Sequence, residues 1–415
     1  MTRRSARARL AVAAGRASGW LSRTTRRGQG ATISGRVMNA IAPDLLSELA
    51  ADQHVAIVSA TNGKTTTTRL LAAAVASDGR PLVTNSTGAN LTSGIAPTLA
   101  RAHGPGTAVL EVDERVVERV VDPLRAELLV YANLSRDQLD RYGEVHAVGD
   151  AWRRVSEQHP DLAVVANASD PHVVWAASPA KVTWVALGLG WRNDAATCPS
   201  CGSLLDWSAE RFDCRHCGFA QPDAPHALDG DTVQLDGRRV ELALQLPGAW
   251  NRANAALALV AATTHFGIDP EDAARAMGRV TTVAGRFMHV PLGDGRDATV
   301  ILAKNPAGWS EALRHVAGRE GSAVTIAVNA RVADGKDPSW LWDVPYEWLH
   351  GHPVAAAGER HRDVAVRLRY ADLEPLVEPD PIRAAGALDA PEGFIIASYT
   401  QFSALYRRFG RAERA

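Results

Sequence analysis

Residues 55–66 read VAIVSATNGKTT, an apolar run of four followed by a short polar loop. The apolar run is typical of a buried strand, and helical spacing follows the loop as far as residue 79. In a strand-loop-helix unit of this kind, backbone N–H groups and the helix N-terminus hold phosphate oxygens. The segment therefore predicts a nucleotide site, with Lys64 at the terminal phosphates and the Thr65 hydroxyl on Mg²⁺.

Short apolar runs continue after this loop and alternate with helical patterns. The further buried strands are predicted near residues 109–110, 128–130, 162–165 and 182–187. The helical patterns lie at about 66–77 and 145–157. Such alternation is typical of a parallel sheet with helices on both faces. The sequence therefore predicts an α/β fold.

The chain has 415 residues, whereas a single hydrophobic core rarely grows past about 250–300. After the first series we expect a hairpin at 231–246 with its turn at Asp236-Gly237, then helices at about 251–266 and 270–279. A second α/β series has strands near 298–303, 323–328, 353–357 and 393–398. We predict a basic N-terminal helical arm at 1–45, a central domain at 46–290 and a C-terminal α/β domain at 296–415.

The charge is balanced overall but not along the chain. The net charge is −1, yet nine arginines precede the first acidic residue, Asp44, which leaves 36 basic and 46 acidic residues for the rest. With 46% apolar and 22% charged residues, the composition excludes general disorder. The acidic body argues against a nucleic-acid partner, and we expect none.

The arginine-rich start lacks the pattern of an export signal or a membrane span. Its apolar stretch at 10–15 is broken by Arg16, and no later run approaches the length of a span. We therefore expect a cytoplasmic protein. Leu10, Trp20 and Leu21 lie at helical spacing among the arginines, so this helix either docks on the body or lies on the inner face of an anionic membrane.

All four cysteines fall within twenty residues, in two C-x-x-C pairs. They are Cys198, Cys201, Cys214 and Cys217. Four thiolates at this spacing are typical of a structural Zn²⁺ site, which is favoured over disulfides in the expected compartment. The polar stretch at about 191–225 interrupts the α/β rhythm, so we predict that it is a zinc ribbon inserted into the central domain. His216 is a competing ligand, but both pairs are complete without it.

The TNGKT loop resembles that of Mur ligases and folylpolyglutamate synthetases, ATP-dependent enzymes that activate a carboxylate as an acyl phosphate. Other segments resemble the family's motifs in the family's order: VLEVD at 109–113, NLSRDQLDRYG at 133–143, LPGAWNRANA at 246–255, AGRF at 284–287 and NP at 305–306. The departures are Ala60 for a usual Gly, Gln138 and Trp250 for His, and Ile301 for Asp. The resemblance implies a Mur ligase-like central domain with a parallel sheet and a C-terminal α/β domain.

The resemblance also implies the roles of particular residues. The ATP site implied by the family consists of Thr61, Asn62, Gly63, Lys64, Thr65, Thr66, Asn251 and Arg286. Lys64 and Arg286 are implied to be catalytic at the transferred phosphoryl group, and Thr65 and Glu111 to hold Mg²⁺.

One branch of the family accounts for several departures together. The segments LAKNPAG at 302–308 and DGKDPSWLWD at 334–343, with the four-cysteine insertion, resemble the MurT proteins, ligase-like subunits of lipid II isoglutaminyl synthases. This implies ATP-dependent amidation of the D-isoglutamate α-carboxylate of lipid II in peptidoglycan synthesis. Since the cysteines are assigned to zinc, ammonia is implied to come from a partner, a GatD-type glutaminase.

Asp337 is predicted to act across that partner interface. A Cys-His glutaminase needs a third group to orient its histidine, and a docked subunit can supply one. Asp334 is the expected turn former and Asp343 the expected cap or local acceptor. Asp337 lies between the turn and the aromatic anchor and matches the aspartate of the D-G-R/K-D-x-S-W motif of MurT proteins, so the resemblance implies that it faces the partner; the alternative is a solvated loop acid. Trp340 and Trp342 are the aromatic type that anchors interfaces.

Two alternatives remain at this point. A stand-alone amino-acid ligase of the Mur or folylpolyglutamate type needs an amine site instead of a glutaminase-docking face. A nucleic-acid binder with a phosphate loop and a zinc ribbon needs a basic patch beyond the N-terminal arm.

Overall fold

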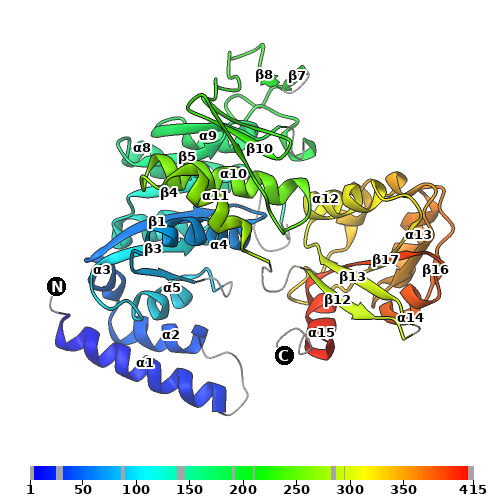
Figure 1. Ribbon diagram of the computed structural model, residues 1–415, viewed down its shortest axis with the longest axis horizontal. Helices are drawn as coiled ribbons and strands as arrows, with labels where there is room; N and C mark the ends of the chain where they lie inside the picture. The colour runs from blue at the N-terminus through cyan, green and yellow to red at the C-terminus, as the bar shows by residue number, and fades with distance from the viewer. Residues whose placement is uncertain are drawn as a thin grey trace. The chain divides into compact units, whose positions relative to one another are not determined.

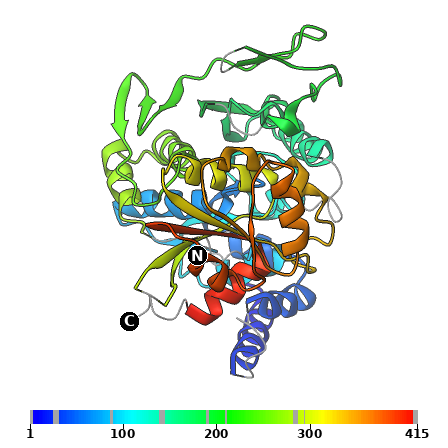
Figure 2. The ribbon, with the colours of Figure 1, turned by 90° about the vertical axis from the view of Figure 1, so that its right-hand side faces the viewer.

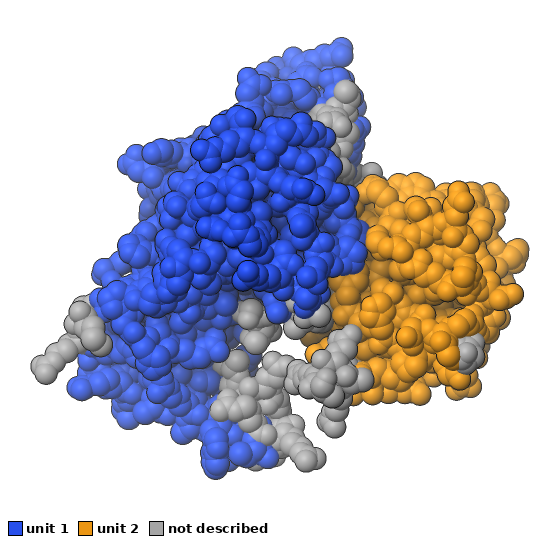
Figure 3. Space-filling view, in the orientation of Figure 1, with its two compact units in different colours: residues 1–135, 145–281 blue, residues 136–144, 282–415 orange. Residues whose placement is uncertain are grey.

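The computed structural model describes residues 4–24, 31–85, 89–137, 145–188, 192–208, 211–281, 287–293 and 295–409. The chain forms two compact units, coloured separately in Figure 3. Unit 1 comprises residues 1–135 and 145–281, and unit 2 comprises residues 136–144 and 282–415.

A nine-stranded sheet forms the centre of unit 1 (Figure 1). Its order is β11-β10-β9-β6-β5-β4-β1-β3-β2, and the ladders from β9 to β2 are parallel. The parallel strands are β1 (Gln53–Ser59), β2 (Leu82–Thr84), β3 (Gly106–Glu111), β4 (Leu128–Tyr131), β5 (Ala163–Asn167), β6 (Lys181–Ala186) and β9 (His226–Asp229). The predicted α/β class with a parallel sheet is therefore confirmed. The chain passes from β3 on one side of β1 to β4 on the other, the kind of crossing point beside which α/β sheets bind ligands.

Helices cover both faces of this sheet. One face carries α4 (Lys64–Val75), α10 (Ala249–Thr264) and α11 (Pro270–Gly278), which pack against one another. The other face carries α3 (Leu45–Ala50), α5 (Thr92–Leu99), α6 (Val117–Leu124), α8 (Val145–Gln158) and α9 (Pro171–Ala177). Side chains alternate along β1, so that Val55 and Ile57 belong to the core of this second face.

The hairpin and the cysteine segment lie on the side of the sheet opposite β2. β10 (Thr232–Leu235) and β11 (Arg238–Glu241) pair antiparallel, and Asp236 and Gly237 between them both have positive φ, which a tight hairpin turn requires. This confirms the predicted hairpin. The cysteine segment lies between the paired strands β6 and β9 and contains the short ladder β7 (Asp206–Ser208) with β8 (Arg211–Asp213), at the top of Figure 1.

The N-terminal arm consists of two helices that lie side by side in Figures 1 and 2. α1 (Ala6–Thr24) packs on α2 (Ala31–Ile41), and α2 packs on α5. The second contact is close because Gly35 has no side chain: a Cβ there would lie 1.7 Å from the carbonyl oxygen of Ser93. Within the described residues, every helix is too short or too polar to span a bilayer.

Unit 2 contains a six-stranded sheet of order β12-β13-β17-β14-β15-β16, parallel except for the β12-β13 pair. The strands are β12 (Phe287–Pro291), β13 (Asp297–Leu302), β14 (Ser322–Ala327), β15 (Val354–Ala357), β16 (Leu376–Val377) and β17 (Glu392–Ala397). Among the described residues of unit 2, the α-helices are α12 (Pro306–Ala317), α13 (His361–Arg369), α14 (Pro381–Gly386) and α15 (Tyr399–Phe409). Because β12 pairs with β13, it belongs to this unit, whereas the expected boundary near 290–296 placed it in the central domain.

Candidate functional site

The phosphate loop joins β1 to α4 and is clamped by the segment after β4. The backbone N–H of Thr61 donates to the carbonyl oxygen of Asn133 (2.9 Å), and that of Asn62 donates to Asn133 Oδ1 (2.9 Å). Asn133 Nδ2 donates back to the carbonyl oxygen of Asn62 (2.9 Å). Gly63 has φ +80°, and a Cβ there would lie 2.5 Å from Asn254 Oδ1. The loop therefore needs glycine both for its backbone angle and for the space occupied by α10.

Lys64 is buried beneath this loop. Its ammonium donates to the carbonyl oxygens of Ala60 and Thr61 and to Glu114 Oε2, the last at 2.8 Å. The side chains of Lys64 and Glu114 are only 11% and 10% exposed. The peptide oxygen of Glu114 accepts from the indole N–H of Trp152 (2.8 Å). Glu114 is a site residue that the sequence analysis missed, and its only signal was its place three residues after Glu111.

Glu111 ends β3, beside the end of β1 in the ladder. It is buried; its Oε1 accepts from Asn90 Nδ2 (3.3 Å), whereas Oε2 has no hydrogen-bond partner among the described residues. A buried carboxylate oxygen without a donor is costly unless a cation compensates it. Oxygen ligands are the ones that Mg²⁺ prefers, so Glu111 fits the predicted magnesium role.

The remaining predicted nucleotide residues lie on two neighbouring helices. Thr65 and Thr66 are in the first turn of α4, and Asn251 lies one turn before Asn254 on α10. The amide of Asn251 is buried and donates to the carbonyl oxygen of Pro247 (2.6 Å). Arg286, like Gln138, lies outside the described residues. The structure thus brings the TNGKTT loop, Glu111 and the start of α10 together.

The four cysteines of the insertion converge on one point. The Sγ atoms of Cys198 and Cys217 are 3.6 Å apart, as are those of Cys201 and Cys214, and all four lie within 4.8 Å of one another. Tetrahedral Zn–S bonds of about 2.3 Å place sulfurs about 3.8 Å apart, far from the roughly 2.0 Å of a disulfide. The thiols are therefore placed for a metal ion, and the donor set fits zinc.

Two matching turns position these thiols. The N–H of Gly202 donates to the carbonyl oxygen of Cys198 (2.8 Å), and the N–H of Gly218 donates to that of Cys214 (2.9 Å). Both glycines have φ +75°, so a side chain would strain either turn. Phe212 and Val174 of α9 complete a small core with Cys198 and Cys214.

Unit 2 has a cavity of about 100 Å³ at the start of α12. It is lined among others by Lys304, Asn305, Asp334, Asp337, Trp340 and Asp343. Asn305 caps α12 by accepting from the N–H of Gly308 (2.9 Å). The rings of Trp340 and Trp309 are in tilted contact, with the centroids 5.6 Å apart and the planes at 33°.

The three aspartates of this segment have different surroundings. Asp334 is buried and accepts from the N–H of Thr400 (2.7 Å), from its hydroxyl and from the N–H of Arg331. Asp343 pairs with Arg136 (3.1 Å between Oδ2 and Nη1). Asp337 is exposed and accepts from the N–H of Ser339 (2.8 Å), a hydrogen bond that lowers its pKa. Of the three aspartates, Asp337 is the exposed one, Asp343 is half-buried and Asp334 is buried.

Comparison with known proteins agrees with this architecture. The Mur ligase middle domain family matches residues 58–262, and the MurT ligase C-terminal family matches residues 302–401. Among solved structures, a pseudomurein peptide ligase type C from Methanothermus fervidus has a TM-score of 0.68 at 17% identity, covering 89% of this chain and 81% of its own. Folylpolyglutamate synthase from Mycobacterium tuberculosis has a TM-score of 0.59 at 17% identity, covering 88% and 93%. The fold and the phosphate loop define a ligase of the Mur ligase type.

Full-length relatives narrow this class. The MurT subunit of lipid II isoglutaminyl synthase (glutamine-hydrolyzing) from Streptococcus pneumoniae is 29% identical over 94% of both chains. The corresponding subunit from Staphylococcus aureus is 28% identical, over 92% of this chain and 94% of its own. With the matches to both domains, the chain belongs to the MurT family.

Proposed function

We propose that this chain is the ATP-dependent subunit of a lipid II isoglutaminyl synthase. The D-isoglutamate α-carboxylate of the lipid-linked precursor attacks the γ-phosphorus of ATP, ADP leaves, and an acyl phosphate forms. Ammonia then adds to the acyl carbon, the C–N bond forms, and phosphate leaves with the C–O bond pair while ammonia loses a proton. Activation is needed because a carboxylate has no leaving group for an amine to displace.

The observation that carries this proposal is the loop between β1 and α4, with Lys64 buried beneath it and Glu111 at the end of the neighbouring strand β3. Lys64 would stabilise the charge of the transferred phosphoryl group, and the loop N–H groups would orient the phosphates. Magnesium, when bound by Thr65 and Glu111, would neutralise phosphate charge. Arg286 is proposed as a second cation on the same group, on the strength of the AGRF resemblance.

Ammonia is proposed to come from a GatD-type glutaminase subunit. The names of the relatives call them subunits of a glutamine-hydrolysing enzyme, and all four cysteines of this chain lie in the cluster assigned to zinc, which leaves none as a glutaminase nucleophile. Asp337 would orient the partner's catalytic histidine. In the same segment Trp342 is 55% exposed and packs edge-on against Tyr370, which is 73% exposed, with the ring centroids 5.2 Å apart. These two rings supply the exposed aromatic surface that an interface anchor needs.

The test is a reconstituted reaction with lipid II, ATP and Mg²⁺. Amidation is followed by mass spectrometry of the released peptide, with either ammonium or glutamine as nitrogen donor and with or without the glutaminase. The proposal expects ammonium to support amidation by this chain alone and glutamine only in the complex. Amidation that requires an amino acid in place of ammonia would instead establish the stand-alone ligase.

A further inference from the structure

The N-terminal arm presents two different faces. The inner face of α1 consists of small residues that are buried: Ala8, Ala11, Val12, Gly15, Gly19 and Ser22. A Cβ on Gly15 would lie 2.4 Å from Met38 Cγ, so α1 sits close against α2. The docked-helix alternative of the sequence analysis therefore holds for this face, and it leaves the opposite face to explain.

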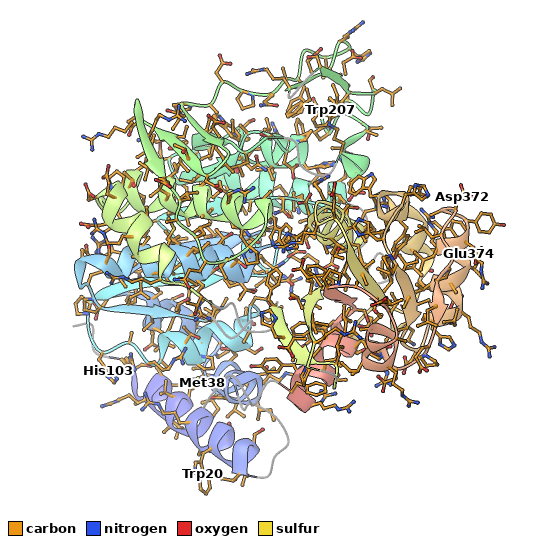
Figure 4. All side chains as sticks on the ribbon, turned by 45° about the vertical axis from the view of Figure 1, so that its right-hand side comes forward. Trp20, Met38, His103, Trp207, Asp372 and Glu374 are labelled. Atoms are coloured by element: carbon orange, nitrogen blue, oxygen red, sulfur yellow. The ribbon has the colours of Figure 1, made fainter. Side chains whose placement is uncertain are left out.

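The outer face of α1 is apolar and exposed. It consists of Leu10, Ala13, Ala17, Trp20 and Leu21, at the spacing of one helical stripe. Leu10 is 63% exposed, Trp20 62% and Leu21 56%. Figure 4 shows Trp20 projecting from α1 away from the rest of unit 1. Residues of this size at this exposure over three turns mark a contact surface, whereas scattered single ones do not.

Basic residues border this stripe. Arg7 lies at one edge of the stripe, Arg9 and Arg16 lie at the other, and all three are exposed. Arg7 donates to the carbonyl oxygen of Ile41 (2.6 Å) and Arg16 to that of Ala100 (3.0 Å), which ties the arm to α2 and to the end of α5. No acidic residue occurs among the first 43 residues of the chain. An apolar stripe between arginines is the pattern of a helix that lies in a lipid interface.

We propose that the outer face of α1 binds the surface of an anionic phospholipid membrane. Leu10, Trp20 and Leu21 enter the boundary between headgroups and acyl chains, and the arginines contact lipid phosphates. The charge decides between occupants, because a second copy of the same arginine-bordered face would be repelled. This inference rests on the proposed function, because binding of α1 to the membrane would hold the enzyme at the surface where its lipid-linked substrate lies.

The test is co-sedimentation of the full chain, with its glutaminase partner, on vesicles that contain no peptidoglycan precursor. Vesicles of phosphatidylglycerol and phosphatidylcholine are compared with pure phosphatidylcholine at low and high salt. We expect binding to the anionic vesicles that weakens with salt. Leu10→Asp combined with Trp20→Asp should reduce binding at least tenfold, whereas Leu376→Asp, at a 39% exposed apolar residue of unit 2, should leave it unchanged.

Two further variants separate the apolar and electrostatic contributions. Arg9→Ala should weaken binding to anionic vesicles about fivefold, the factor for one basic residue near such a surface, and leave the residual binding to neutral vesicles unchanged. Trp20→Phe should keep binding but lose most of the vesicle-induced change in tryptophan fluorescence. Circular dichroism and Tm show whether each variant is folded.

Several outcomes would overturn the proposal. The first is that the parent protein does not bind the vesicles, and the second is that the Leu10→Asp/Trp20→Asp variant binds them equally well. The third is that this variant abolishes self-association of the chain or its binding to the glutaminase, which would mean that the outer face of α1 contacts protein and not lipid. Amidation of a water-soluble, short-chain substrate with ammonium should be the same in parent and variant. If the parent protein lacks this activity, the proposed function is contradicted. The membrane proposal is tested separately, because vesicle binding is measured without any substrate.

Discussion

The candidate functional groups of the two units differ in how they are held. Lys64 in unit 1 is buried, and its ammonium is held by two carbonyl oxygens and Glu114. Asp337 in unit 2 is exposed, and its carboxylate accepts from the backbone N–H of Ser339. A group that acts on phosphate bound by its own chain benefits from low dielectric and fixed geometry, whereas a group proposed to act on a partner has to be presented at the surface. The difference predicts that a substitution at Lys64 will impair amidation with either nitrogen donor, whereas a substitution at Asp337 will impair only the release of ammonia from glutamine.

The largest expected effect is that of Lys64→Ala. Removing an ammonium from the transferred phosphate should cost several kcal/mol in the transition state, which lowers amidation with either nitrogen donor about a thousandfold or more. The measurement is ATP-dependent amidation with ammonium and with glutamine. Lys181→Ala is the matched control, because Lys181 is exposed on β6 and should not affect the rate. Near-parental activity of a folded Lys64→Ala protein would refute the nucleotide assignment.

The next effect should be confined to glutamine. Asp337→Asn keeps the shape but removes the charge that would orient a partner histidine, so glutamine-dependent amidation should fall about a hundredfold or more. The reaction with ammonium and the formation of the complex should be spared. Asp343→Asn is the control, since this carboxylate pairs with Arg136. If Asp343→Asn alone suppresses glutaminase activity, Asp337 has been assigned wrongly.

A third prediction concerns the metal. Protein purified without chelators should contain one zinc per chain, and Cys198→Ser should lose it and lower Tm, because four thiolates close the site and leave no position for a catalytic water. Elemental analysis and thermal unfolding measure both. His216→Ala, between Cys214 and Cys217, should retain the zinc. A disulfide in the native protein, or zinc lost from the His216→Ala variant, contradicts this assignment.

The smallest effect is expected at Glu114. Glu114→Gln keeps the side chain's size but weakens its hold on the Lys64 ammonium, so kcat/KM for ATP should fall about tenfold through misplacement of that ammonium. Asp113→Asn is the matched control, because the neighbouring carboxylate pairs with Arg115 (3.4 Å) and not with Lys64. An equal loss in both variants would mean that Glu114 has no specific role toward Lys64.

Local pattern was sufficient for much of this protein. The strand-loop-helix unit at 55–79, the Asp236-Gly237 turn and the paired C-x-x-C segments depend on residues close together in sequence, and β1, the hairpin and the cysteine cluster lie where the sequence predicted them. Turn geometry, strand burial and metal-ligand spacing are local properties, and the sequence alone determined these elements and the α/β class.

The tertiary structure alone decided the contacts between residues that are far apart in the chain. Glu114 reaches Lys64 across 50 residues, and Asn254 approaches Gly63 from α10. β12 joins unit 2 because its partner strand is β13. The sequence of α1 was compatible both with docking on the protein and with binding to a membrane. The packing of Gly15 against Met38 shows that one face of α1 docks on the protein, whereas the opposite face stays exposed. Such contacts depend on how the sheet and its helices pack, which no short-range pattern encodes.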